Sequence, residues 1–175
     1  MPETSLTAEA RSATGEEATR IAEICVSSYQ AAYQELLPPG YIERTVAEYF
    51  GEARVTRQVR AALPGWFGYQ VAEEGGRLVG VSGGGLTAPG VGELHLIYLD
   101  PRERGRGLGT LLLDRVTEMI RSSGGTQMWV SVFLGDAAGI GFYRSRGFQP
   151  METVQAPLSR TDDHIRSLRM RRLLN

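Results

Sequence analysis

The chain contains no lysine, since all 19 of its basic residues are arginine. A P-loop places a lysine directly after its last glycine, so the sequence excludes that class of phosphate site. Cysteine is also scarce: Cys25 is the only one, which excludes an intrachain disulfide and a metal site built on several thiolates. We therefore expect no metal, and we expect Cys25, on an apolar helical stripe with Ile21 and Ile24, to be buried.

Long apolar runs are missing as well. The longest uncharged stretch, residues 78–92, is rich in glycine and too short to span a bilayer. The first residues lack the basic and apolar regions of a signal peptide, and a net charge of −1 gives no general attraction to nucleic acid or to an anionic membrane. The sequence thus predicts a cytoplasmic protein with no nucleic-acid partner and no membrane partner.

Size and composition are those of an ordinary globular protein. With 175 residues, of which 42% are hydrophobic and 22% charged, the chain is long enough to bury a sizeable core. We expect one domain over residues 1–175, with a flexible tail at residues 1–5, that exists as a monomer or a homodimer.

The most informative stretch is residues 92–121. A short apolar strand, Glu93 to Leu99, ends at Asp100-Pro101, because proline has no N–H to give to a sheet. A glycine-rich loop then opens directly into a helix whose apolar residues recur on one face. The order strand, loop and helix is typical of an anion-binding site.

The loop has the chemistry of a phosphate or pyrophosphate site. Its glycines let the backbone approach a ligand closely, and the unpaired N–H groups of the helix start attract an anion, as do the arginines. A dinucleotide fold is not favoured, because its G-x-G-x-x-G spacing is absent. A connection that binds nothing is the alternative. The predicted ligand-binding residues are Arg104, Gly105, Arg106, Gly107, Leu108, Gly109 and Thr110.

Periodicity and turn residues predict the other elements. Thr14 followed by Glu17 indicates a capping box at the start of the first helix. The expected strands are 6–12, 67–73, 77–83, 126–133, 148–154 and 164–173, and the expected helices are 15–34, 41–62 with a break near Gly51, and 137–146. The strand at 126–133 is expected to run parallel to the strand at 93–99.

A serine hydrolase is a second reading of the sequence. Residues 80–84 (GVSGG) match the G-x-S-x-G nucleophile elbow, and Ser82, Asp100 and His164 would supply a triad. The elbow requires a helix directly after the serine. Here more glycines and a proline follow, so the context that would confirm the motif is absent.

Two motifs in order resemble the GNAT family of N-acetyltransferases. Arg104-x-x-Gly107-x-Gly109, after a strand ending in Leu99-Asp100-Pro101, resembles the family's acetyl-CoA-binding motif. About 35 residues further on, residues 142–148 (FYRSRGF) are similar to its second motif. The resemblance implies an α/β (α+β) fold with a mixed, splayed sheet flanked by helices. It also implies acetyl transfer from acetyl-CoA to the primary amine of a small molecule or peptide, by direct transfer in a ternary complex.

The resemblance also implies roles for individual residues. Backbone groups of Ile97, Tyr98 and Leu99 would hold the pantetheine arm, and Tyr143 would be the general acid that protonates the leaving thiolate. Asp136 stands where the family commonly has asparagine, and Gly139 where it commonly has alanine. An ionised aspartate cannot donate a hydrogen bond, which weakens the expected contact of Asp136 with the cosubstrate.

The general base is expected on the central strand. Glu93 is the first candidate, since many GNAT enzymes carry a glutamate on this strand, and His95 on the same face is the second. The first third of the chain would shape the acceptor pocket, with three tyrosines that either line it or pack on the sheet: Tyr29, Tyr33 and Tyr41. A non-catalytic acyl-CoA-binding domain is the main alternative within this fold.

Overall fold

A computed structural model describes residues 7–175, although not the side chain of Ala62. The predicted tail at residues 1–5 and the first residue of the predicted strand at 6–12 lie outside the described residues. The rest of that strand is β1 (Glu9–Ser12), and a short 3-10 turn (Gly15–Glu17) leads into α1 (Ala18–Tyr33). The predicted capping box is confirmed, because the Thr14 N–H donates to Glu17 Oε1 at 2.8 Å.

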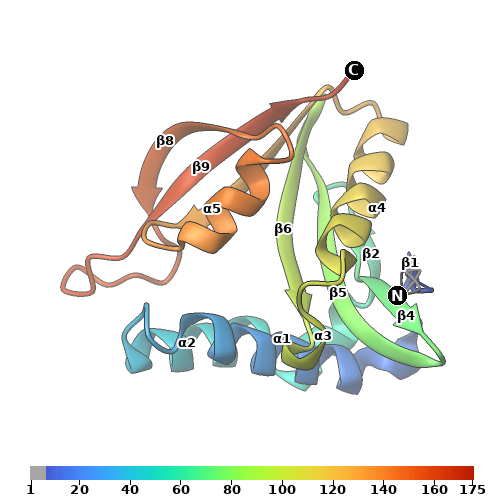
Figure 1. The fold of residues 1–175 in the computed structure, drawn as a ribbon, viewed down its shortest axis with the longest axis horizontal. Helices are drawn as coiled ribbons and strands as arrows, with labels where there is room; N and C mark the ends of the chain where they lie inside the picture. The colour runs from blue at the N-terminus through green and yellow to red at the C-terminus, as the bar shows by residue number, and fades with distance from the viewer. Residues whose placement is uncertain (1–6) are drawn as a thin grey trace, which may run out of the picture.

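Seven strands form one twisted sheet (Figure 1), in the order β1-β4-β5-β6-β7-β9-β8. Every neighbouring pair is antiparallel except β6 and β7, which are parallel as predicted. The strands are β4 (Gln70–Glu74), β5 (Arg77–Ala88), β6 (Val91–Leu99), β7 (Gln127–Phe133), β8 (Gln149–Gln155) and β9 (Arg166–Leu173). The mixed α/β fold class is confirmed.

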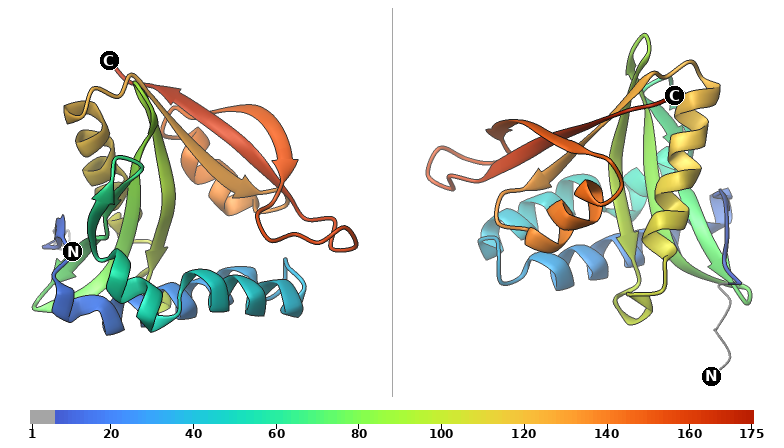
Figure 2. Two further views of the ribbon diagram at one scale, coloured as in Figure 1. Left: turned by 180° about the vertical axis from the view of Figure 1, so that it is seen from behind. Right: turned by 45° about the horizontal axis from the view of Figure 1, so that its top comes forward.

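The sheet splits between its two parallel strands. β6 pairs with β7 only from Val91 to Leu94, whereas it stays paired with β5 as far as Leu99. Beyond Leu94 the two strands diverge, and the two halves of the sheet open like a V (Figure 2). The splayed sheet predicted from the resemblance is therefore present, and the β7-facing edge of β6 is left without a strand partner from His95 to Leu99.

Helices cover both faces of the sheet. α1, α2 (Pro39–Tyr49) and α3 (Glu52–Gln58) share one core with β4 and β5, in which Cys25 is fully buried as expected. α4 (Leu108–Ser122) packs on the other face through its apolar stripe, and α5 (Ala137–Arg144) packs against β7. Within residues 7–175, no helix has both the length and the hydropathy needed to cross a bilayer.

The predicted helical region at 41–62 is partly wrong. It begins earlier, at Pro39, breaks at Gly51 as expected, and ends at Gln58. The following residues form β2 (Arg60–Leu63), which pairs in a hairpin with β3 (Trp66–Gly68). The Pro64-Gly65 turn between them favours a hairpin over a continued helix.

The strand predicted at 77–83 is also longer than expected, because β5 continues past Gly83 through two more glycines to Ala88. These glycines allow close packing rather than a turn. A Cβ on Gly83 would collide with the indole of Trp66, and a Cβ on Gly85 would collide with the backbone of Gly65. The β2–β3 hairpin thus lies directly on β5, and Trp66 is held beside the centre of the sheet.

Candidate active site

Two cavities open beside the point where β6 and β7 diverge. The first, here called the loop cavity, has a volume of about 280 Å³ and lies between the diverging strands, the start of α4 and helix α5. The predicted ligand-binding residues that line it are Ile97, Tyr98, Leu99, Arg104, Gly109, Asp136 and Tyr143. Segments far apart in the sequence therefore meet around one space, but five predicted residues do not line it: Gly105, Arg106, Gly107, Leu108 and Thr110.

The second cavity, here called the aromatic cavity, has a volume of about 490 Å³. It lies between the helices α1–α3, the β2–β3 hairpin and the sheet. Tyr29, Tyr33 and Tyr41 all line it, and Tyr29 and Tyr41 are also buried in the core, so both alternatives stated for these tyrosines apply. Further aromatic lining residues are Tyr98, which was predicted to contact the cosubstrate, and five not singled out from the sequence: Tyr49, Phe50, Trp66, Tyr69 and Phe133.

The two cavities meet at the middle of β6. His95 and Tyr98 line both, together with Tyr33 from α1 and Ser131 from β7. The register between β5 and β6 shifts here, because Gly83 lies opposite Leu96 and Gly84 opposite Leu94. His95 is thus the extra residue of a β-bulge, a feature that redirects a side chain and interrupts pairing. A ligand in one cavity can reach a ligand in the other at this point.

The imidazole of His95 is held in one orientation. Its Nε2 lies 3.0 Å from the carbonyl oxygen of Gly65, in the turn of the β2–β3 hairpin. A carbonyl oxygen only accepts, so Nε2 carries a hydrogen and Nδ1 is the nitrogen that can gain or lose a proton. Among the described residues Nδ1 has no hydrogen-bond partner. This arrangement suits a proton acceptor.

Glu93, in contrast, is bound to another side chain. Both of its carboxylate oxygens accept hydrogen bonds from Arg169 on β9, with Oε2 at 2.9 Å from Nη2. Arg169 also donates to Ser131 and lies 5.2 Å from the centre of the Trp129 ring. The carboxylate lines the aromatic cavity only, and its charge is balanced. Sequence reasoning missed Arg169, because 76 residues separate the two partners.

The glycine loop is shaped to approach a ligand. Gly105 and Gly107 have φ angles of +77° and +81°, which other residues rarely adopt, and no atom lies within 4 Å of where a Cβ would stand. Gly107 is the N-cap of α4, so the first N–H groups of that helix face the same open space. Leu108, predicted as a ligand-binding residue, is fully buried and lines neither cavity.

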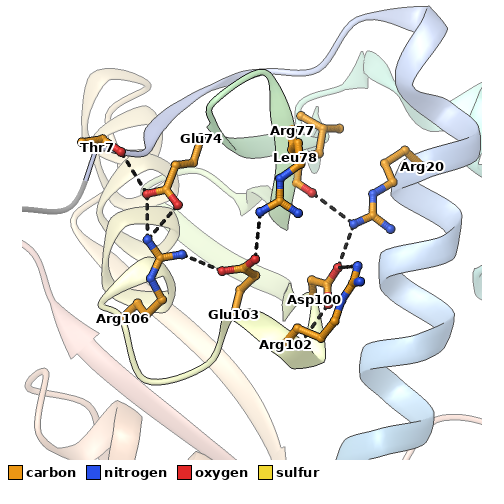
Figure 3. A network of polar contacts seen from close by, with 9 residues as sticks. All are labelled: Thr7, Arg20, Glu74, Arg77, Leu78, Asp100, Arg102, Glu103 and Arg106. Atoms are coloured by element: carbon orange, nitrogen blue, oxygen red, sulfur yellow. Dashed lines mark hydrogen bonds and ion pairs between the residues drawn. The ribbon is translucent and has the colours of Figure 1, made fainter. Parts of the chain in front are cut away.

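A network of ion pairs holds the glycine loop in place against neighbouring elements (Figure 3). Asp100 accepts hydrogen bonds from Arg102 and, at 2.8 Å, from Arg20 on α1. Arg106 binds two carboxylates, those of Glu74 and Glu103, and so its charge is already balanced. The sequence could not distinguish Arg106, which holds the loop in place, from a ligand-binding arginine.

Arg104 remains available to a ligand. Its exposed side chain lines the loop cavity, and it forms no hydrogen bond or ion pair with another of residues 7–175. A second guanidinium near the start of α4, that of Arg146, was missed from the sequence. It donates to the Thr110 side chain at 3.0 Å and stacks 3.8 Å from the Phe142 ring centre. Arg146 could have been noticed in the sequence, because it lies in the second motif, FYRSRGF, two positions after that motif's first arginine.

Tyr143 and Asp136 both lie at the wall of the loop cavity, near Tyr33. Burial, aided by the negative charge of Asp136, raises the pKa of the Tyr143 phenol, so this group keeps its proton. Asp136 caps α5, since its Oδ1 accepts from the Gly139 N–H at 3.0 Å. A Cβ at position 139 would collide with the same carboxylate. Asp136 and Gly139, the two positions that depart from the family pattern, thus belong to one local feature at the start of α5.

The residues of the alternative triad are not assembled. Ser82 is fully buried in the middle of β5, and no helix follows it. Asp100 is bound by two arginines, and none of Ser82, Asp100 and His164 lines either cavity. The hydrolase reading is therefore wrong, because the G-x-S-x-G match lies within a strand packed against the Trp66 hairpin.

Comparison with known proteins agrees with this geometry. Residues 23–148 match the family model described as Acetyltransferase (GNAT) family. N-alpha-acetyltransferase RimI of Mycobacterium tuberculosis is 38% identical over 84 residues, which are 46% of this chain and 51% of that protein. The matches cover between 29% and 51% of the first curated relatives, so this chain corresponds to about half of their length or less.

Solved structures share the fold over nearly the whole chain. PaiA N-acetyltransferase from Thermoplasma acidophilum, in complex with coenzyme A, has a TM-score of 0.81 at 18% identity and covers 97% of this chain and 100% of that one. The yncA protein of Salmonella typhimurium, with acetyl-CoA, has a TM-score of 0.67 at 22% identity and covers 97% and 95%. At this identity the likeness establishes the fold.

The ion pairs of Asp100 predict how stability depends on pH. Hydrogen bonds from Arg102 and Arg20 hold the pKa of Asp100 well below its usual range. A carboxyl with a lowered folded-state pKa stabilises the fold above its unfolded pKa of about 3.9, and this contribution is lost as the pH falls further. We expect Asp100→Asn to lower the free energy of unfolding by about 2 kcal/mol at pH 7.

Denaturant unfolding of both proteins between pH 7 and pH 3 measures this effect. The difference between wild type and Asp100→Asn should shrink below about pH 4. Arg102→Gln is the matched control and should cost less, because the Arg102 side chain is 75% exposed. A difference that stays constant with pH would mean that the carboxylate charge does not stabilise the loop.

Proposed function

Because the chain belongs to the GNAT acetyltransferase family, we propose that it transfers an acetyl group from acetyl-CoA to a primary amine by direct transfer in a ternary complex. The main support is the meeting of the loop cavity and the aromatic cavity at His95 and Tyr98. A non-catalytic acyl-CoA binder needs the first cavity alone. The expected setting is the cytoplasm, with a small-molecule or peptide amine as acceptor.

The loop cavity is the proposed site of acetyl-CoA. Arg104, the backbone of Gly105 to Gly107 and the first N–H groups of α4 would bind the pyrophosphate. The β7-facing backbone groups of Ile97 to Leu99 lack a strand partner and would bind the pantetheine arm as an added strand does. Acetyl-CoA supplies an activated thioester, whose carbonyl carbon accepts the amine nitrogen as the thiol leaves.

His95 is the proposed general base. It lies where the two cavities meet, and the Gly65 carbonyl leaves its Nδ1 free to accept a proton from the amine. Glu93, the first candidate from the sequence, has both oxygens engaged by Arg169. We therefore assign Glu93 a positioning role at the point of strand divergence, and we keep its test as a direct comparison with His95.

Tyr143 is the proposed donor to the leaving sulfur. It lines the loop cavity, and its raised pKa keeps the phenol protonated. A phenol with a raised pKa transfers its proton to a thiolate less readily, because a thiol has a pKa of about 8.5. Tyr143 would therefore act mainly by a hydrogen bond that strengthens as charge develops on the sulfur. This differs from the full proton delivery expected from the sequence.

The two arginines of the loop should behave differently. Arg104→Gln should weaken acetyl-CoA binding about tenfold or more, because it removes an uncompensated cation from the proposed pyrophosphate site. Arg106→Gln should lower the melting temperature and change the dissociation constant of acetyl-CoA much less, because its bonds go to Glu74 and Glu103. Calorimetric titration with acetyl-CoA measures both effects. The reverse order of affinities would exchange the roles of these residues.

The general base is tested by a pair of variants. His95→Gln should lower kcat about a hundredfold and change acetyl-CoA affinity much less, since the ring is bonded to the Gly65 carbonyl on the side of the aromatic cavity. Glu93→Gln should mainly lower stability, because it leaves Arg169 without its carboxylate. Steady-state kinetics and thermal melts of both proteins separate the effects. A larger loss of kcat in folded Glu93→Gln would make Glu93 the base.

The reaction itself is tested with Tyr143→Phe beside the wild type. Acetyl-CoA-dependent thiol release in the presence of a panel of primary amines should be detected for the wild type. Tyr143→Phe should lower kcat by about 10²-fold with little change in acetyl-CoA affinity, since the interaction acts on the transition state. The Phe142 and Phe148 contacts of the ring should keep the variant folded. Absence of thiol release with every amine, despite acetyl-CoA binding, would favour the non-catalytic alternative.

A further inference from the structure

Polar atoms without partners gather around the aromatic cavity. Among the described residues, Tyr29 Oη, Thr45 Oγ1 and Arg54 Nε are buried and form no hydrogen bond of normal geometry, although the Tyr29 and Thr45 hydroxyls lie near one another, and all three residues line this cavity. Buried polar groups in folded proteins are nearly always hydrogen-bonded, so unpaired groups beside a cavity point to a ligand. The Arg54 guanidinium only donates hydrogen bonds, and the two hydroxyls are able to donate them. A ligand group that accepts hydrogen bonds would therefore match all three.

Arg54 gives this part of the cavity a positive charge. Its guanidinium lies 5.2 Å from the centre of the Tyr49 ring, and Tyr49 follows Thr45 by one turn of α2. The nearest carboxylate, that of Glu48, lies 3.6 Å from Nη1, and its side chain is 56% exposed, so this pair is weak. The other charged lining residue, Glu93, is already balanced by Arg169. An anionic group would compensate Arg54.

Aromatic rings line the same cavity as Arg54 and lie close to His95, the proposed point of transfer. The ring of His95 lies 6.1 Å from Trp66, and Trp66 lies 4.9 Å from Tyr69, measured between ring centres. Burial raises the pKa of Tyr69, and the positive charge of Arg54, which lines the same cavity, acts on this phenol in the opposite direction. His95, Trp66, Tyr69 and Arg54 all line one cavity, so a ligand that fills it contacts aromatic side chains as well as Arg54.

We propose that the acceptor is a primary amine that carries a carboxylate at the end opposite its amine, with an apolar body between them. This inference rests on the proposed function. The amine would lie at His95, the body against Trp66 and Tyr69, and the carboxylate would accept hydrogen bonds from Arg54 and the neighbouring hydroxyls.

A matched pair of amines tests this. In 4-(aminomethyl)benzoate and 4-methylbenzylamine the ring and the amine are the same, and a carboxylate in one replaces a methyl group in the other. With the wild-type protein saturated with coenzyme A, calorimetry should give a dissociation constant at least tenfold lower for the benzoate. With acetyl-CoA, kcat/KM should favour the benzoate by a similar factor.

Variants on α3 locate the effect. Arg54→Gln should remove the preference for the benzoate, and Arg54→Lys should restore a part of it, since charge is regained without the planar geometry. Arg57→Gln, on the same helix but outside the cavity lining, is the matched control and should keep the preference. A preference equal in the wild type and folded Arg54→Gln would overturn the assignment of Arg54.

The outcomes separate this inference from the proposed function. If the wild type binds both amines equally well, the carboxylate proposal is overturned, and no variant is needed to show it. This holds even when both amines are acetylated. Preferential binding of the benzoate through Arg54, without turnover of either amine, supports the ligand class and contradicts the transferase function. Tighter binding of the methyl compound would show that the cavity selects an apolar end.

Discussion

The site depends on the limited pairing of β6 with β7. Only Val91 to Leu94 are bonded to β7, so the backbone of β6 from His95 to Leu99 faces a cavity on one side while β5 holds it on the other. A strand with free N–H and C=O groups inside a protein requires partners, and a ligand with amide groups supplies them. The same divergence makes room for α4 to direct its first N–H groups toward that space. The divergence of β6 from β7 therefore determines both the shape of the sheet and the place where a ligand would bind.

Glu93 and Arg169 stand where the strands begin to diverge. Glu93 lies opposite Trp129 in the last paired stretch, and Arg169 reaches it across β7 from β9. Two hydrogen bonds between a planar guanidinium and a carboxylate fix both side chains, and Trp129 stacks on the guanidinium. The pair links the two halves of the sheet just before they separate. It also engages both carboxylate oxygens of Glu93, which is why His95 is the proposed general base.

The sequence predicted those parts of the site that come from contiguous residues. The glycine loop, the strand before it and the second motif with Tyr143 were located, because local turn and helix chemistry determines them. The β2–β3 hairpin was missed, since its strands are short and Trp66 is positioned by contact with Gly83 rather than by its own periodicity. Likewise, which arginine binds a ligand depends on partners distant in the chain, as the Glu74 contact of Arg106 illustrates.

All basic residues of the chain are arginines, and the contacts that these arginines make in the structure fall into two groups. Most of the arginines near the site already have partners within the protein. Arg106, for example, donates hydrogen bonds to two carboxylates, and Arg146 stacks on the Phe142 ring. Arg104 in the loop cavity and Arg54 in the aromatic cavity keep donors without partners. On the functions proposed here, each would bind the anionic end of one substrate. The reacting ends would then meet near His95, where no uncompensated charge lies and where an amine must become neutral before it can attack.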